Sequence, residues 1–205
     1  MSRPFILGLG GTAREGSASE RAMRVALEHA QALGADTDVF SGNDLLLPHY
    51  KPGAAERTAN AARLIELFRR ADGIILCSPA YHGSTSGLIK NAIDYSEDLR
   101  LDERVYWDGR AIGCICCAGG WQGGAQVLAT LRAMAHALRG WPTPFGAIVN
   151  TSLPAFDTEG KVVDTGIRQQ LQTVGAQVVD FAAMKLAAGN WNGDADTRQF
   201  EPKTI

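Results

Sequence analysis

The chain has 205 residues, a mass of 21.9 kDa and a formal net charge of -2 at pH 7. That length suits one domain with a substantial core and leaves little room for a second. The near-neutral charge gives no general attraction to nucleic acid or to an anionic membrane, so we expect neither as a partner. The sequence shows no signal-like apolar stretch and no apolar run of about 18 residues, and we expect a cytoplasmic protein.

Short apolar runs alternate with longer amphipathic segments along the chain. Runs of strand length occupy residues 5–9, 37–40, 73–77, 111–117 and 145–150. Segments with apolar residues three and four apart, which predict helices, occupy residues 18–33, 55–71, 87–95, 123–138 and 165–187. This order predicts that each strand is followed by a crossover helix.

Strict alternation of this kind predicts an α/β fold with three layers, in which helices cover both faces of a five-stranded parallel sheet. Ligands of such sheets lie beyond the carboxyl ends of the strands, so the loops after the first, third and fourth strands are the places to search. We assign residues 1–188 to a single domain. Residues 189–205 lose the helical pattern and are expected to form a C-terminal tail, which Trp191 and Phe200 would dock.

All four cysteines lie inside apolar runs: Cys77, Cys114, Cys116 and Cys117. Cys114 and Cys117 are spaced as Cys-x-x-Cys, but both lie within one apolar run, and no Cys/His cluster with zinc spacing accompanies them. We therefore expect buried, unreactive thiols and no metal site.

The segment after the first expected strand is rich in glycine and hydroxyl residues. It reads Gly10-Gly11-Thr12-Ala13-Arg14-Glu15-Gly16-Ser17-Ala18-Ser19 and opens directly onto a helix. Free amides at a helix N-terminus favour a dianion, and Arg14 would add a charge-assisted hydrogen bond. We predict a phosphate monoester here. The alternative is that Ser17 or Ser19 only caps the helix and Arg14 is a solvated surface charge.

Two other phosphate-binding motifs do not fit this segment. The stretch Gly8-Leu9-Gly10-Gly11 lacks the third glycine of a dinucleotide fingerprint, and no Gly-Lys-Ser/Thr follows it. A Rossmann dehydrogenase and a P-loop nucleotidase are therefore disfavoured.

The segment after the third expected strand carries a family resemblance. It reads Ser78-Pro79-Ala80-Tyr81-His82-Gly83-Ser84-Thr85-Ser86-Gly87-Leu88-Ile89-Lys90-Asn91-Ala92-Ile93-Asp94-Tyr95. This stretch resembles the Pro-x-Tyr-Asn/His-x-Ser signature of the NADPH-dependent FMN reductase family, and the first loop is similar to that family's Gly-Ser/Thr-x-Arg-x-x-Ser phosphate loop. The resemblance spans about residues 5–150 and implies a flavodoxin-like fold with strand order 2-1-3-4-5.

The resemblance also implies which residues hold the flavin. The FMN phosphate would lie against the first loop, at Thr12, Arg14, Ser17, Ala18 and Ser19. The edge of the isoalloxazine ring would run along the second loop, at Pro79, Ala80, Tyr81, His82, Gly83 and Ser84. From the residues alone, Pro79 and Gly83 would turn the backbone so that its amides face the flavin, and Tyr81 would form an aromatic wall. The chain departs from the family at His82, where many members have Asn, and at Ser86, where many have Pro.

A third loop follows the fourth expected strand and reads Ala118-Gly119-Gly120-Trp121-Gln122-Gly123-Gly124. Its amides are exposed with little side-chain bulk, and we predict that the pyrimidine ring of the flavin lies there, at Ala118, Gly119, Gly120 and Trp121. Donors at this edge would stabilise the anionic reduced flavin. The alternative is that the glycines only allow tight packing of helix on strand.

The function that the resemblance implies is hydride transfer from NADPH through FMN to a free flavin, a quinone, an azo compound or a metal oxyanion. FMN supplies the chemistry, so no catalytic side chain is assigned. The 2′-phosphate of NADPH would need a cation, and the sequence does not choose among Arg14, Lys51 and Arg110. Lys90 and Asp94 are expected to form an ion pair on one helix face and to have a structural or interfacial role, not a catalytic one.

Two other classes of protein remain alternatives at this point. A flavodoxin-type electron carrier would serve a protein partner, but the near-neutral charge and the second loop argue against it. A flavin-free interaction module on the same scaffold is disfavoured because all three loops are retained. Relatives with this resemblance associate as homodimers or homotetramers, which we expect here.

Overall fold

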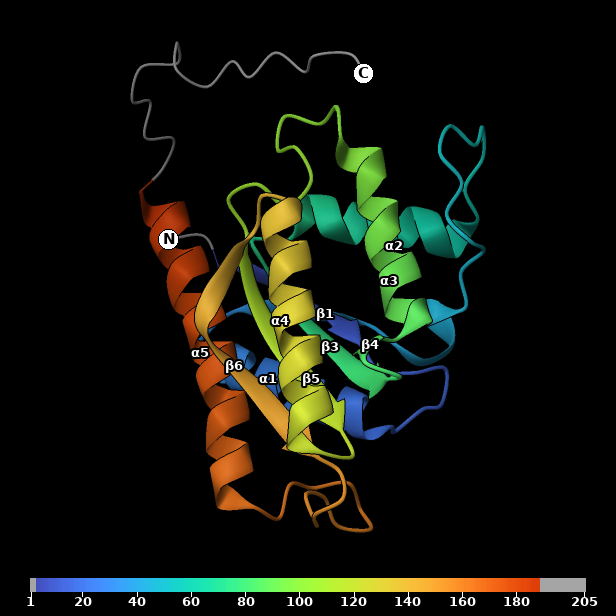
Figure 1. Ribbon diagram of the computed structural model, residues 1–205. Helices are drawn as coiled ribbons and strands as arrows, with labels where there is room; N and C mark the ends of the chain where they lie inside the picture. Colours follow the sequence, from blue (N-terminus) through green and yellow to red (C-terminus); the bar gives the residue numbers. More distant parts are fainter. Residues whose placement is uncertain (1–2, 189–205) are drawn as a thin grey trace.

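The computed structural model describes residues 3–188 as a parallel sheet between two layers of helices (Figure 1). The tail expected at 189–205, with Trp191 and Phe200, lies outside the described residues. The strands are β1 (Phe5–Gly10), β2 (Asp36–Phe40), β3 (Gly73–Tyr81), β4 (Ser84–Thr85), β5 (Ala111–Ala118) and β6 (Trp141–Asn150). The helices are α1 (Ala18–Ala32), α2 (Ala59–Arg70), α3 (Gly87–Asp94), α4 (Trp121–Ala137) and α5 (Thr165–Ala187), with 3-10 turns η1 (Gly42–Leu45) and η2 (Tyr95–Leu99).

The long strands lie in the order β2-β1-β3-β5-β6 and all neighbouring pairs are parallel. Numbered among themselves, these strands follow the expected order 2-1-3-4-5, so the flavodoxin-like fold class is confirmed. The remaining strand, β4, pairs antiparallel with the end of β3 and was not expected from the sequence.

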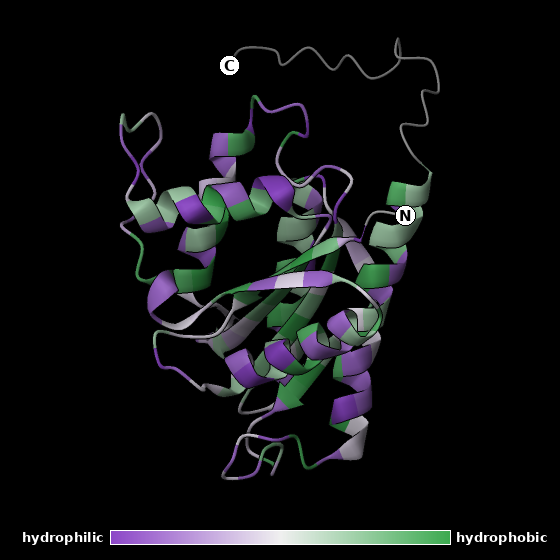
Figure 2. Cartoon of the chain, turned by 180° about the vertical axis from the view of Figure 1, so that it is seen from behind, coloured by the Kyte–Doolittle hydropathy of each residue, from purple (hydrophilic) through white to green (hydrophobic). Residues whose placement is uncertain are grey.

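The two faces of the sheet are covered by different helices. Helices α1 and α5 pack on one face, against strand residues such as Ile6, Ile75 and Ile115. Helices α2, α3 and α4 pack on the other, against residues such as Leu9 and Leu76. Apolar strands therefore lie between helices whose outer surfaces are polar (Figure 2).

Helices α1 and α5 approach each other closely at Gly175. A Cβ atom built there would lie 2.3 Å from the carbonyl oxygen of Ala26, so only glycine fits. All four cysteines are buried free thiols, as expected. Burial raises the pKa of Cys114 and of Cys116 to about 12, so these thiols stay protonated and unreactive near neutral pH.

Several element boundaries differ from the sequence prediction; β6, for example, begins at Trp141 rather than at residue 145. Strand β3 continues to Tyr81 rather than ending at residue 77, because Ser78 and Pro79 remain in register with β5. Helix α2 begins only at Ala59, where the Thr58 hydroxyl accepts from the amide of Ala61. Helix α4 begins at Trp121, two residues before the expected start at 123. In addition, β3 is followed by β4 before its helix, so the expectation of a helix directly after every strand is wrong there.

No helix in the part of the chain from residue 3 to residue 188 combines the length and the apolar character that a membrane span requires.

Candidate functional site

The connections that follow β1, β3, β5 and β6 gather at one edge of the sheet, toward the lower right of the view in Figure 1. They comprise residues 11–17, 82–83, 119–120 and 151–164. The carboxyl ends of parallel strands lie at the same edge of a sheet, so the three loops that the sequence singled out meet here. A fourth connection, residues 151–164, which the sequence did not single out, lies at the same edge.

The loop after β1 presents free backbone donors. Gly11 adopts a φ of 103°, and its amide donates to the carbonyl of Cys77 on β3 at 3.2 Å, which turns the chain outward. The amides of Ala13, Glu15 and Ala18 donate no hydrogen bond to any acceptor within residues 3–188. These donors lie where the predicted phosphate would need them.

Ser17 and Ser19 are both buried at the start of α1. Ser17 is the N-cap, and its hydroxyl accepts from the Glu20 amide at 3.4 Å; the Glu20 carboxylate in turn accepts from the Gly16 amide at 2.9 Å. The capping role of Ser17 is therefore present in the structure. Its oxygen also lies 3.4 Å from that of Ser19, and when one hydroxyl donates to the other, the second keeps a free donor.

The Thr12 hydroxyl is already hydrogen-bonded to the backbone, whereas the Arg14 side chain is not hydrogen-bonded within residues 3–188. The Thr12 hydroxyl accepts from the Arg14 amide at 3.1 Å and lies 3.2 Å from the Arg14 carbonyl, so it would have to turn to reach a ligand. The Arg14 side chain is exposed and has no partner among residues 3–188. A second cation, Arg21, packs over this loop: a Cβ built on Gly16 would lie 3.6 Å from Arg21 Nη2.

The second loop is a hairpin rather than the turned loop expected at Pro79. Pro79 lies within β3, opposite Cys117. Because proline has no backbone N–H, this strand position has no hydrogen-bond donor. The turn is instead made by His82 and Gly83, with φ of 49° and 85°, between Tyr81 and Ser84. Two successive positive φ values define a hairpin turn that favours Asn-Gly, and His is among the residues that tolerate the first position.

Ser78 ties this hairpin to the start of α3 and was not singled out from the sequence. Its buried hydroxyl accepts from the Thr85 hydroxyl at 2.6 Å and from the Ser86 amide at 3.0 Å, and donates to the Pro79 carbonyl at 2.8 Å. The hairpin is therefore held firmly at its base, while Tyr81 at its tip is 51% exposed.

The third loop shortens to two glycines before α4. Gly120 is the N-cap of this 17-residue helix but has no side chain to cap it, whereas Ser17 caps α1 and Asp164 caps α5. The first amides of α4, from Trp121 onward, are therefore free to bind a ligand. The helix N-terminus also favours negative charge at this point.

The glycines of the third loop fall into two kinds. A Cβ built on Gly124 would lie 2.4 Å from Cγ2 of Ile148, so Gly124 is required for packing of α4 on β6. A Cβ on Gly120 would meet nothing within 4 Å, and one on Gly119 would make an ordinary contact of 3.6 Å with Ser152 Oγ. Neither residue has a positive φ. The packing alternative therefore explains Gly124 and leaves Gly119 and Gly120 without a structural requirement.

Other predicted residues lie outside this edge or are already engaged. Arg110 is buried at the opposite end of β5, where it donates to the carbonyls of Tyr106 and Arg69 at 3.0 Å, and burial lowers its pKa to about 10. It cannot contact a cofactor phosphate. Lys90 and Asp94 form the expected ion pair at 2.5 Å on the surface of α3.

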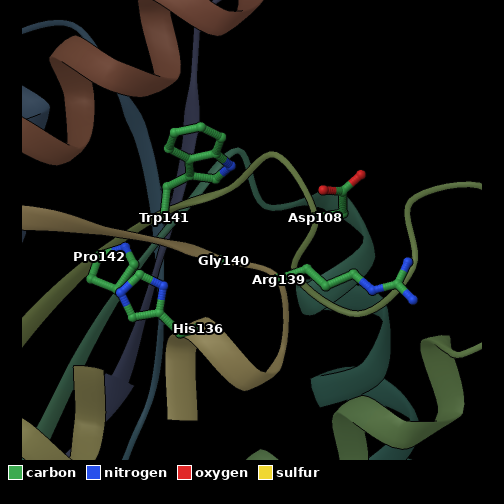
Figure 3. Close-up of a pocket in the computed structure, with 6 residues that line it drawn as sticks. All are labelled: Asp108, His136, Arg139, Gly140, Trp141 and Pro142. Atoms are coloured by element: carbon green, nitrogen blue, oxygen red, sulfur yellow. The ribbon is translucent and has the colours of Figure 1, made fainter. Parts of the chain in front are cut away.

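A hollow of about 720 Å³ lies at the opposite edge of the sheet from these loops (Figure 3). His136 and Pro142 lie together on one side of it, and Arg139 extends away. Its rim is formed by exposed side chains around Trp141, with no gathering of free backbone donors. Among residues 3–188, the carboxyl edge is the candidate site because uncapped amides lie there beside Gly120, where an added Cβ would meet nothing within 4 Å.

The residues at the carboxyl edge fit a flavin nucleotide. Free amides and the paired hydroxyls of Ser17 and Ser19 suit a phosphate dianion, and the unfilled space at Gly120 suits the flat edge of a ring. The exposed ring of Tyr81 provides a stacking surface on the hairpin side.

Comparison with known proteins agrees with this chemistry. Residues 4–152 match the family "NADPH-dependent FMN reductase". The chain is 33% identical over 88 residues to an NADPH azoreductase from a Bacillus species, covering 42% of the chain and 46% of that protein, less than half its length. It is 26% identical over 179 residues to the NADPH-dependent FMN reductase ArsH of Shigella flexneri, covering 87% of the chain and 69% of the relative.

Solved structures agree on the fold. The flavoenzyme NAD(P)H:acceptor oxidoreductase FerB of Paracoccus denitrificans superposes with a TM-score of 0.69 at 22% identity, over 89% of the chain and 98% of FerB. A WrbA-like flavodoxin from Agrobacterium tumefaciens gives a TM-score of 0.59 at 16% identity, over 90% and 99% of the two chains. The family match covers most of the sequence and includes all three predicted loops. The chain therefore belongs to the NADPH-dependent FMN reductase family of oxidoreductases.

Proposed function

We propose that this chain transfers hydride from NADPH through bound FMN to a small-molecule acceptor such as a free flavin or a quinone. The observation that carries the proposal is the uncapped N-terminus of α4 beside the open space at Gly120. FMN and NADPH are the cofactors of the family. When bound, FMN supplies the redox chemistry by accepting hydride at N5 and passing it on.

At the phosphate end, the free amides of the loop after β1 and the Ser17–Ser19 hydroxyl pair would hold the dianion. Arg14 would close over it as an exposed cation, and Ala18 would contribute its amide. Thr12 would join this set only after its hydroxyl turns from the backbone of Arg14.

At the ring end, the hairpin and the third loop would orient the isoalloxazine. The end of β3 at Pro79 and Ala80, with His82, Gly83 and Ser84 in the turn and β4, would lie along one edge, and Tyr81 would cover part of the ring. Ala118, Gly119, Gly120 and the first turn of α4 at Trp121 would face the pyrimidine edge and stabilise negative charge there. No side chain is required as an acid or a base, because orientation and electrostatics are what the protein contributes.

A single exposed cleft would serve both NADPH and the acceptor in turn. Steady-state kinetics would then give parallel double-reciprocal lines, whereas intersecting lines would indicate that FMN dissociates as a substrate. The name of the Bacillus relative makes an azo compound a further candidate acceptor. The alternative, a flavodoxin-type carrier for a protein partner, predicts FMN binding without rapid reduction by NADPH.

We also propose a homodimer or homotetramer in the cytoplasm. Tyr81 and Trp121 are 51% and 57% exposed beside the site, which suits closure by a second copy of the chain, and four free thiols suit a reducing compartment. Light scattering with size-exclusion chromatography tests the assembly, and a monomer at micromolar concentration would refute it.

Titration of the ligand-free protein with FMN and with riboflavin tests the site. Because riboflavin lacks the phosphate, we expect FMN to bind at least tenfold more tightly, the scale of one or more hydrogen bonds to a charged group. Equal affinities would refute the phosphate site, and absence of binding for both would refute the proposed function.

A further inference from the structure

The connection after β6 holds the third loop in place. The Ser152 hydroxyl donates to the carbonyl oxygen of Gly119 at 2.7 Å, and the amide of Thr151 donates to the carbonyl of Ala118 at 2.8 Å. The sheet ladder between β5 and β6 therefore continues past its last strand pair, Ala118 and Asn150, into the loops.

Ser152 is itself fixed by the last residue of β6. Its amide donates to Oδ1 of the buried Asn150 at 3.0 Å, and the amide of Leu153 donates to the Asn150 carbonyl at 3.2 Å. These two bonds form a tight turn in which the Asn side chain substitutes for a backbone acceptor. The Ser152 hydroxyl is thus held at Gly119 by a turn rather than by a freely moving loop.

Fixing the Gly119 carbonyl also fixes the next amide. In a trans peptide the C=O and the following N–H point in opposite directions, so the Gly120 N–H points away from Ser152. Strand β5 lies between β6 and β3, and Ser152 follows β6, so this N–H is directed toward the side of β3. The first turn of α4 faces the same way, since a Cβ built on Gly123 would lie 4.0 Å from Cβ of Ala80.

The peptide that follows Gly120 is restrained as well. Its carbonyl accepts from the Gly124 amide at 3.1 Å, which is the first bond of α4. Within residues 3–188, the Gly120 N–H has no acceptor. A single donor is therefore held in a defined direction, at the edge where the proposed FMN would place its pyrimidine ring.

We infer that Ser152 is a positioning residue that aims the Gly120 N–H at the pyrimidine edge of FMN and thereby favours the reduced flavin. The inference rests on the proposed function. Reduced FMN carries more negative charge at this edge than oxidised FMN, so a donor held in place stabilises it more. Loss of the Ser152 hydroxyl would let the peptide rotate and would weaken binding of reduced FMN selectively.

The test compares two variants of nearly equal shape, Ser152→Thr and Ser152→Val, because only the first keeps a hydroxyl. We expect Ser152→Val to weaken binding of reduced FMN about fivefold more than binding of oxidised FMN, the scale of one hydrogen bond. For a two-electron couple this lowers the midpoint potential by about 20 mV, tenfold being about 30 mV. Ser152→Thr should retain the wild-type potential.

A control removes a hydroxyl from the middle of α4, away from the third loop. The Thr130 hydroxyl donates to the Gln126 carbonyl at 2.9 Å in the middle of α4, and Thr130→Val should leave the potential unchanged. An equal potential in Ser152→Val and wild type, or an equal shift in Ser152→Thr and Ser152→Val, overturns the inference while the proposed function stands. Failure of the wild-type protein to bind FMN refutes the proposed function and the inference with it.

Discussion

The variant Gly120→Ala tests whether the space beside Gly120 is needed by a ligand rather than by the fold. A Cβ at Gly120 meets nothing within 4 Å in the ligand-free chain, and its φ of -175° suits any residue. Alanine is a poorer N-cap than glycine but restricts the unfolded chain, and these effects offset to within about 1 kcal/mol. We therefore expect the free energy of unfolding of Gly120→Ala to stay close to that of wild type.

The same methyl group would intrude on a flavin ring seated over the third loop. Overpacking of this size costs about 1–3 kcal/mol, which corresponds to roughly 5–150-fold weaker FMN binding. The matched variant is Gly124→Ala, whose Cβ would lie 2.4 Å from Ile148 Cγ2 and should destabilise the fold by about 1–3 kcal/mol. Urea unfolding and FMN titration of both variants are the assays. Wild-type FMN affinity in Gly120→Ala would refute the placement of the ring.

Three further predictions concern the phosphate loop, the hairpin and the half-buried ion pair of Arg57 and Asp98. Arg14 is exposed and unpaired among residues 3–188, so Arg14→Ala should weaken FMN binding by about 1.5–3 kcal/mol and leave riboflavin binding and the melting temperature unchanged; an unchanged FMN dissociation constant would exclude a phosphate contact. His82 has a φ of 49°, so His82→Val should lower the free energy of unfolding by about 1–2 kcal/mol while His82→Asn does not, and equal urea midpoints would contradict the strained turn. The hydrogen bond from Arg57 holds the pKa of Asp98 below its ordinary 3.8; the pair therefore stabilises the fold above that pH and is lost as the pH falls through the lowered value. In Asp98→Asn, the free energy of unfolding should therefore fall less steeply as the pH is lowered from about 6 to about 2. An unchanged pH dependence, measured by urea unfolding over that range, would show that the pair contributes nothing.

The fold was largely predictable because the central strands β1, β3 and β5 are buried on both faces and therefore appear as short apolar runs. The expected β5, at residues 111–117, differs from the observed strand by one residue. Strand β3 was cut short because Ser78 and Pro79 are typical of turns, yet β5 pairs with both and the Ser78 hydroxyl is satisfied by Thr85 and Ser86. Those partners lie several residues away and cannot be read from local composition.

The candidate site was predictable where a local pattern specifies it and unpredictable where tertiary contacts do. Ser17 at a helix start and the glycines before α4 are local signals, and the structure brings both to one edge of the sheet. Ser152 and Arg21 carry no such signal, because their positions depend on where the connection after β6 lies. Arg110 was a candidate for a phosphate contact until its burial against carbonyl oxygens placed it at the other end of the sheet.

The measurement that tests the central claim most directly is anaerobic mixing of the FMN-loaded protein with NADPH and, separately, with NADH. Loss of the yellow absorbance of oxidised flavin is followed in a stopped-flow instrument. The proposed function predicts rapid bleaching, and the faster nicotinamide identifies the physiological donor. Stable FMN binding without bleaching by either nucleotide would contradict the claim and favour an electron carrier.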